Sequence, residues 1–210
     1  MDWTLTFVSV FAIFIPALML PGPDFIAVVK SSMTRGISAG LQTTLGVTFG
    51  LGCYASLSLL GLSAILIEYQ WLAWVIRILG GLYLTYLGFK LIFSKPVASE
   101  FEDTELNQRG NPLLFGFLVT LTNPKAIVLF TSVFATAITN AMPLWVMITM
   151  IAIVMASSLT WYALVTLFMS SNRVISRLKN AQHWIERATG VCFIAIGGKI
   201  LADSKNPITP

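Results

Sequence analysis

Charged residues are scarce in this sequence. They make up 10% of its 210 residues, whereas 56% are hydrophobic, and the mean hydropathy is +0.82. A soluble globule of this length needs many more charged side chains to cover its surface. The composition therefore excludes a water-soluble domain and predicts that most of the chain lies in a lipid bilayer.

Nucleophilic and metal-binding side chains are scarce as well. The sequence has one histidine, His183, and two cysteines, Cys53 and Cys192, with no CxxC spacing. We expect both cysteines to be small apolar packing residues, and His183 to be an interfacial residue in a loop. Because no catalytic constellation and no cluster of metal ligands is present, the sequence predicts no enzyme activity, no metal site and no cofactor.

Six apolar stretches are long enough to cross a bilayer, which takes about 20 residues. They cover residues 3–32, 37–67, 69–93, 113–139, 143–171 and 184–202. The polar segment 94–112 is too short to form a core of its own, and we interpret it as a loop. The predicted fold class is all-α, a polytopic membrane protein with a single transmembrane domain over residues 1–210.

Basic residues predict the orientation of these spans. Three connections carry them: Lys30 and Arg35; Lys90, Lys95 and Arg109; Arg173, Arg177, Lys179 and Arg187. By the positive-inside rule these connections are cytoplasmic and both termini are extracytoplasmic, although Lys199 and Lys205 near the C-terminus point weakly the other way. The net charge of +4 is thus explained by topology, and no nucleic-acid partner is predicted, because the basic residues form no stripe.

The two halves of the chain show a weak internal repeat. "WVIRILGGLYL" from Trp74 resembles "WIERATGVCFI" from Trp184, 110 residues later, and Tyr54-Ala55 recurs 108 residues later as Tyr162-Ala163. Chance similarity among so many Leu, Ile and Gly residues is the alternative. A duplicated unit of three spans would give two inverted repeats, at about 1–93 and 113–203, as secondary transporters have.

The first predicted span is interrupted. Pro21 removes a backbone N–H and clashes with the Ala17 carbonyl, and Pro23 does the same at Met19, with the flexible Gly22 between them. We expect the helix to kink or stop there and Asp24 to lie in the first turn of the resumed helix, where the dipole favours a carboxylate. The alternative is a turn at the cytoplasmic end of an 18-residue span, with Asp24 among the headgroups.

The fourth predicted span contains a matching break, "TLTNPKAIVLF". Asn123 is a plausible N-cap, Pro124 suits the first helical position, and Pro23 and Pro124 correspond at an offset of 101 residues. Lys125 follows at the end of the dipole that disfavours a cation, so it needs an anionic partner. Asp24 and Lys125 are both about 15–20 Å from the cytoplasmic edge, which predicts that they pair or hold a ligand between them.

Small residues recur in the second span. Gly36, Gly40, Thr44 and Thr48 lie four residues apart, as do Gly46 and Gly50, a pattern typical of close helix packing. Gln42, Thr43 and Thr44 have a second interpretation, in which their side chains line a polar path.

The chain resembles a known family over essentially its whole length: the lysine exporter superfamily of small six-span proteins, in particular the homoserine/threonine exporter group. The motifs that carry this resemblance are "PGPDF" at 21–25, "RGISAGLQTTLGVTFG" at 35–50, "IRILGGLYLTYLGFKL" at 76–91 and "LTNPKAIVLF" at 121–130. It implies export of amino acids or close derivatives from a bacterial cytoplasm across the inner membrane, driven by the proton gradient. It also marks the Pro21–Asp24 and Asn123–Lys125 motifs as the functional core.

These observations give one mechanistic hypothesis and leave several questions open. Lys125 and the two half-helix N-termini would hold the carboxylate of an amino-acid-like substrate, and Asp24 would hold its ammonium group or an exchanging proton. A channel or facilitator is the main alternative; a membrane thiol-disulfide carrier is disfavoured because neither cysteine lies near a break. Which amino acid is carried, and whether the chain forms a homo-oligomer, is not encoded in any pattern we recognise.

Overall fold

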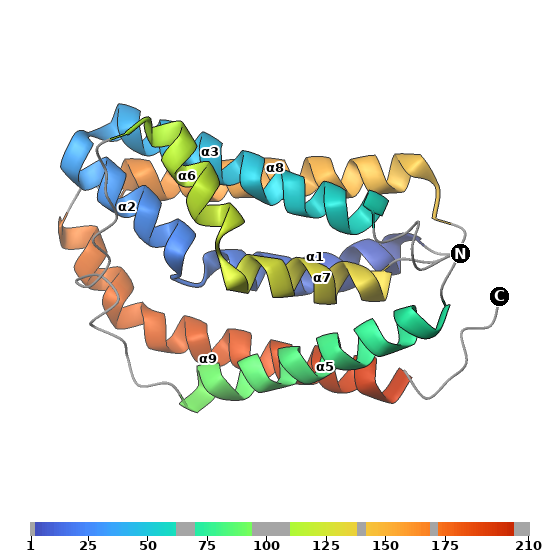
Figure 1. Ribbon diagram of the computed structural model, residues 1–210. Helices are drawn as coiled ribbons and strands as arrows, with labels where there is room; N and C mark the ends of the chain where they lie inside the picture. The colour runs from blue at the N-terminus through green and yellow to red at the C-terminus, as the bar shows by residue number, and fades with distance from the viewer. Residues whose placement is uncertain (1–2, 62–69, 94–109, 138–141, 169–171, 204–210) are drawn as a thin grey trace.

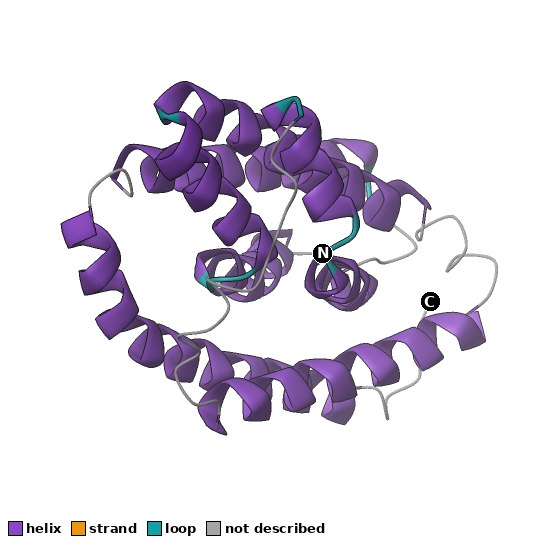
Figure 2. Cartoon of the chain, turned by 60° about the vertical axis from the view of Figure 1, so that its left-hand side comes forward, coloured by secondary structure: helices purple, strands orange, loops and turns teal. Residues whose placement is uncertain are grey.

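The computed structural model describes residues 3–61, 70–93, 110–137, 142–168 and 172–203. Across these residues the chain forms helices and short connections, with no strand (Figure 2). The predicted all-α class is therefore confirmed.

The helices follow in two groups along the chain. The first group is α1 (Trp3–Met19), α2 (Pro23–Arg35), α3 (Ile37–Ser56), the π-helical turn η1 (Leu57–Gly61) and α5 (Gln70–Phe93). The second group is α6 (Pro112–Leu121), α7 (Pro124–Ala137), α8 (Leu144–Phe168) and α9 (Asn172–Asp203).

Length and composition make part of this bundle suitable for a membrane. Two stretches qualify as single spans, Ile37–Gly61 and Leu144–Phe168. The bent pairs α1 with α2 and α6 with α7 bring the number to four if each pair is one span. In α5 only the shorter stretch Ile78–Phe93 is apolar enough, so within the described residues α5 and α9 remain predicted spans.

The last helix is longer than the sequence predicts. Residues 172–183 were expected to form a loop, but α9 begins at Asn172, so that Arg173, Arg177, Lys179 and His183 are helical. The prediction was wrong because hydropathy marks the apolar part of a helix and not its end. No proline or glycine occurs from 172 to 189, and the Lys, Arg, Glu and Ala residues there favour a helix. Two other predicted segments, 62–67 and 94–109, lie outside the described residues.

The cysteines also differ from the prediction. Cys53 on α3 and Cys192 on α9 are both exposed at the surface of the chain instead of packing inside it. The reason is that a chain surrounded by lipid has no need to turn its apolar side chains inward. The same surface exposes large apolar side chains such as Leu114 and Val191.

Close packing through glycine is confirmed. A Cβ atom at Gly46 of α3 would overlap the Leu113 carbonyl oxygen of α6, and one at Gly116 of α6 would overlap the Thr43 carbonyl oxygen of α3. The backbones of these two helices are therefore in direct contact. The prediction is wrong for Gly36, because no atom lies within 4 Å of a Cβ added there. This glycine has a φ of 88°, a left-handed value that suits glycine, and it forms the turn between α2 and α3 instead of a helix contact.

The arrangement places both helix breaks in the middle of the bundle. α1 and α7 lie side by side at the centre, with α3 and α8 packed together on one side and α5 packed against α9 on the other (Figure 1). α1 and α2 run in one direction along the bundle, and α6 and α7 run in the other. The junction of α1 with α2 therefore comes next to the junction of α6 with α7.

Candidate functional site

The first helix stops and restarts where the prolines predict. α1 ends at Met19, and α2 begins at Pro23 with Gly22 as its N-cap, at an angle of 44° to α1. Asp24 lies in the first turn of α2, as expected, where the dipole of the helix favours its carboxylate.

The carbonyl groups released by this break find a donor in the other half of the chain. Pro21 has no N–H to offer to the Ala17 carbonyl four residues earlier. The Lys125 Nζ atom donates to the Ala17 oxygen instead, at 3.0 Å, and also to the Leu20 oxygen, at 3.5 Å. Lys125 therefore lies against the carbonyl end of α1, which carries the partial negative charge that a cation needs.

The second break follows the predicted capping pattern. α6 ends at Leu121, and α7 begins at Pro124 with a bend of 60° between the two helices. The Asn123 Oδ1 atom accepts a hydrogen bond from the Lys125 backbone N–H at 3.0 Å, which confirms Asn123 as the N-cap. The Leu121 carbonyl at the end of α6 accepts from the Tyr54 hydroxyl at 2.7 Å.

Asp24 is in turn held by residues of the second half. Its side chain is buried, with the residue 7% exposed. Oδ1 accepts from the Thr120 hydroxyl at 3.0 Å, and Oδ2 accepts from the Asn123 side-chain amide at 3.1 Å. A buried carboxylate is tolerated only where such donors replace its hydration.

The two breaks are thus joined reciprocally. Asp24 is the second helical residue of α2 and Lys125 is the second of α7, at the same offset of 101 residues that relates Pro23 to Pro124. Asp24 of the first break binds Thr120 and Asn123 of the second, whereas Lys125 of the second binds the carbonyl end of the first. Neither half can rearrange at its break without disturbing the other.

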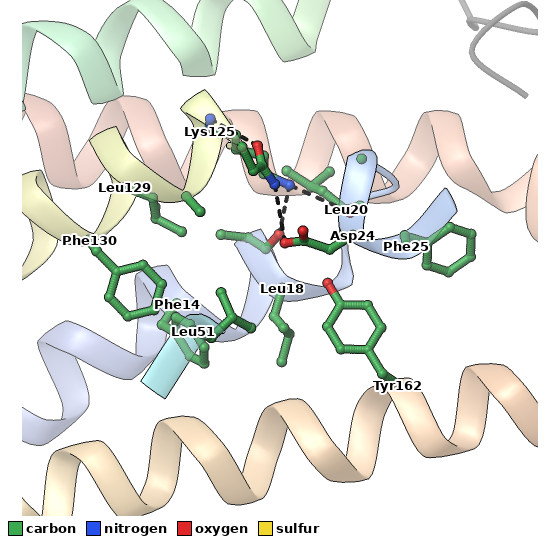
Figure 3. Close-up of a pocket in the computed structure, with 14 residues that line it drawn as sticks. Phe14, Leu18, Leu20, Asp24, Phe25, Leu51, Lys125, Leu129, Phe130 and Tyr162 are labelled. Carbon is green, nitrogen blue, oxygen red and sulfur yellow. Dashed lines mark hydrogen bonds between the residues drawn. The ribbon is translucent and has the colours of Figure 1, made fainter. Parts of the chain in front are cut away.

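A small cavity lies between the breaks (Figure 3). Its volume is about 30 Å³, room for one or two water molecules and less than an amino acid occupies. Asp24, Asn123, Lys125 and Tyr162 are the polar side chains in its wall. Its apolar wall includes five large side chains: Phe14, Leu18, Leu51, Leu129 and Phe130. The wall thus combines an acidic and a basic side chain with apolar side chains.

Comparison with known proteins assigns the family. The chain matches the family model of the LysE type translocator over residues 15–204. It belongs to the LysE type translocator family. An uncharacterized membrane protein of Haemophilus influenzae is 32% identical over 91% of this chain and 93% of its own length. Threonine efflux proteins of Escherichia coli and Salmonella typhi are each 30% identical over 91% of this chain and 95% of theirs. No solved structure matches the chain.

Family membership confirms the resemblance seen in the sequence and makes this a multi-pass membrane protein of a translocator family. Among the residues that the structure describes, no three His, Cys, Asp or Glu side chains gather into a group that would bind a metal ion.

Some of the candidate residues of this translocator come together, and others do not. Gly22, Asp24, Asn123 and Lys125 line the cavity. Pro21 and Pro23 shape the first break but do not line the cavity. Pro124 is the first residue of α7 and does not line it either.

Gln42 and Thr43 lie elsewhere on the translocator. Gln42 is exposed on α3. Thr43 is buried at the contact with α6, and its hydroxyl donates to the Ala39 carbonyl of its own helix at 2.9 Å. Neither residue lines the cavity.

Two residues of the site were not selected from the sequence. Thr120 is the partner of Asp24, and Tyr162 contributes a hydroxyl to the cavity. The recurrence of Tyr54-Ala55 as Tyr162-Ala163 was the available signal for Tyr162. Thr120 gave none, because hydroxyl residues that bond to their own helix are common throughout membrane spans.

Proposed function

We propose that this protein is a secondary transporter that exports amino acids or close derivatives from the bacterial cytoplasm in exchange for protons. The observation that carries the proposal is the reciprocal pair of helix breaks, with Asp24 and Lys125 at one cavity. Ionisable residues within membrane spans mark substrate or ion paths. The relatives named threonine efflux proteins support amino acids as the cargo.

Recognition follows from the charges at the breaks. The Lys125 ammonium and the N-termini of α2 and α7 would bind the carboxylate of the cargo. Asp24 would bind either the cargo ammonium group or a proton. Because these two compete for one carboxylate, loading the cargo from one side and the proton from the other is sufficient to couple their movements.

The size of the cavity supports a carrier that opens and closes. A volume of about 30 Å³ does not admit an amino acid, so the breaks have to separate before cargo enters. The cargo carboxylate would then replace the Ala17 and Leu20 carbonyls at Lys125, and its ammonium group would approach Asp24. Binding and opening are linked because the cargo takes over bonds that now hold the breaks together.

We further propose six spans in two inverted repeats, residues 1–93 and 113–203, in the bacterial inner membrane. Each of the three units in the first half runs opposite to its counterpart, which supports the inversion: α1 and α2 against α6 and α7, α3 against α8, and α5 against α9 (Figure 1). The ends of α2 and α5 and the start of α9 lie at one end of the bundle. These ends carry Arg35, Lys90 and Arg173, which supports a cytoplasmic position for them and extracytoplasmic termini.

Transport in everted membrane vesicles tests the proposal. Export appears as uptake into such vesicles, and a panel of amino acids beginning with threonine is offered with and without an uncoupler of the proton gradient. Accumulation above the outside concentration that collapses with the uncoupler is expected for a proton-coupled carrier. Movement only down the gradient would instead identify a channel or facilitator. Vesicles containing Asp24→Asn at the same protein level are the control.

A further inference from the structure

The hydroxyl group of Tyr162 faces the cavity without contributing a hydrogen bond to the described structure. Tyr162 is 3% exposed, and its ring lines the cavity with the hydroxyl pointing toward Asp24 (Figure 3). Among the residues that the structure describes, no side chain or backbone group forms a hydrogen bond with this hydroxyl. Because the residue lines a polar cavity, this hydroxyl is available to a ligand or to ordered water.

The counterpart of Tyr162 in the internal repeat is Tyr54, and the hydroxyl of Tyr54 does have a hydrogen-bond partner. Tyr54, 108 residues earlier, donates to the Leu121 carbonyl, which the second break leaves without a helical donor. The corresponding carbonyl of the first break is that of Leu20, 101 residues before Leu121, and it accepts from Lys125. Lys125 thus donates to the carbonyl at the first break, as Tyr54 does at the second. The Tyr162 hydroxyl is therefore not needed as a donor to the Leu20 carbonyl.

Hydrogen bonds to neighbouring helices also fix the backbone of α8 at Tyr162. Its backbone carbonyl accepts from the Thr44 hydroxyl at 3.3 Å, and Thr44 is hydrogen-bonded to the Thr166 hydroxyl at 3.2 Å. The Ser32 hydroxyl donates to the Thr166 carbonyl at 3.0 Å. These bonds tie α2, α3 and α8 together beside the cavity, so the backbone that carries Tyr162 is fixed before any cargo arrives.

We propose that Tyr162 is a cargo-binding residue whose hydroxyl oxygen accepts a hydrogen bond from the ammonium group of the amino acid, next to Asp24. This inference rests on the proposed function and adds a specificity-determining contact to it. An ammonium group has three N–H donors, and the Asp24 oxygens already accept from Thr120 and Asn123. A phenol oxygen at the same end of the cavity provides an acceptor that does not compete for a proton near neutral pH.

Tyr162→Phe tests this contact, with Tyr54→Phe as the matched control. Each change removes one hydroxyl and keeps the ring, but only Tyr162 lines the cavity. In everted vesicles we expect Tyr162→Phe to raise the KM for the amino acid about tenfold, the usual effect of losing a hydrogen bond to a charged group. Its maximal rate and thermal stability should stay near wild type. Tyr54→Phe should leave KM unchanged and lower thermal stability, because the Leu121 carbonyl loses its donor.

A cargo analogue without the amino group separates recognition from packing. Such a carboxylic acid should inhibit transport equally well in wild type and in Tyr162→Phe, whereas the amino acid itself should bind more weakly to the variant. If the variant binds both compounds more weakly by the same factor, Tyr162 only shapes the cavity and the inference is overturned. A wild-type KM in Tyr162→Phe overturns it as well.

Asp24→Asn, measured in the same vesicles, separates this inference from the proposed function. Loss of export in Asp24→Asn with a wild-type KM in Tyr162→Phe refutes the role of Tyr162 alone. Wild-type export in Asp24→Asn refutes the proposed site, and the role of Tyr162 falls with it.

Discussion

The Lys125 ammonium nitrogen lies 3.0 Å from the Ala17 carbonyl oxygen, the acceptor that Pro21 leaves without its helical donor. A lysine from the second half of the chain therefore completes a hydrogen bond that a proline in the first half removes. In the core of a bilayer no water is available to form a hydrogen bond with an unpaired carbonyl. Pro21 and Lys125 are consequently coupled, and changing either residue should alter the effect of the other on the stability of the protein.

This coupling can be measured by a double-mutant cycle. Lys125→Met leaves the Ala17 and Leu20 carbonyls without their ammonium donor, at a cost of about 1–3 kcal/mol per unsatisfied group. Pro21→Ala restores an N–H that can donate to Ala17, so the double variant should be more stable in detergent than Lys125→Met alone. Pro16→Ala, at the proline inside α1, is the control. Equal effects of Pro21→Ala in the wild-type and Lys125→Met backgrounds would show that no coupling exists.

The glycines at the contact of α3 with α6 give a second prediction. Gly46→Ala forces a methyl group into the Leu113 carbonyl, so the helices must separate and thermal stability should fall by several degrees. Gly198→Ala in α9 has no atom within 4 Å of the added carbon. It should be neutral or stabilising by up to about 1 kcal/mol, because alanine is the better helix former. Equal melting temperatures for the two variants would contradict direct backbone contact.

The sequence was most informative where a residue acts on its own backbone. Pro21 and Pro23 dictate a helix break whatever surrounds them, and Asn123 and Pro124 cap a helix by local geometry, so both breaks were predicted at the right residues. The partner of Lys125 was not, because the carbonyl end of α1 becomes available only once α7 lies beside α1. The role of Thr120 likewise depends on α6 approaching α2, which no spacing along the chain reveals.

Hydropathy failed in a different way. It finds apolar stretches, and so it missed the polar first turns of α9 from Asn172 and could not tell that Cys53 and Cys192 lie at the exposed surface of their helices. A lipid-facing surface has the same composition as a packed interior, so composition alone cannot tell which side of a membrane helix is buried.

The orientation prediction is tested by labelling the termini. In a background with Cys53→Ala and Cys192→Ala, single cysteines are introduced at Asp2 and Thr209 and treated with a membrane-impermeant thiol reagent on intact cells. Both should react, because the basic connections are expected in the cytoplasm. The two native cysteines are exposed on the chain, so their removal should leave transport unchanged. Reaction at only one terminus would mean that the number of spans is odd.

The last prediction concerns Asp24 and Lys125 together, because each lies in the wall of the same cavity and each is held by the other break. Removing Lys125 leaves the buried Asp24 without its electrostatic counterpart, a loss on the order of 3–5 kcal/mol, and removing Asp24 should cost less because Lys125 is only half-buried. Asp24→Asn should therefore abolish proton-coupled export, and Lys125→Ala should weaken recognition of the carboxylate.

Because the destabilisation in each single variant comes from an uncompensated charge, Asp24→Asn/Lys125→Gln should be better folded than either, although inactive. Thermal unfolding in detergent and the amount of protein in the membrane measure this, with Lys199→Gln at an exposed position of α9 as the control for loss of a charge. If the double variant is as unstable as the sum of the singles, the two charges act independently. If Asp24→Asn exports at the wild-type rate and with the wild-type pH dependence, the first break is only a turn, and Asp24 carries neither proton nor cargo.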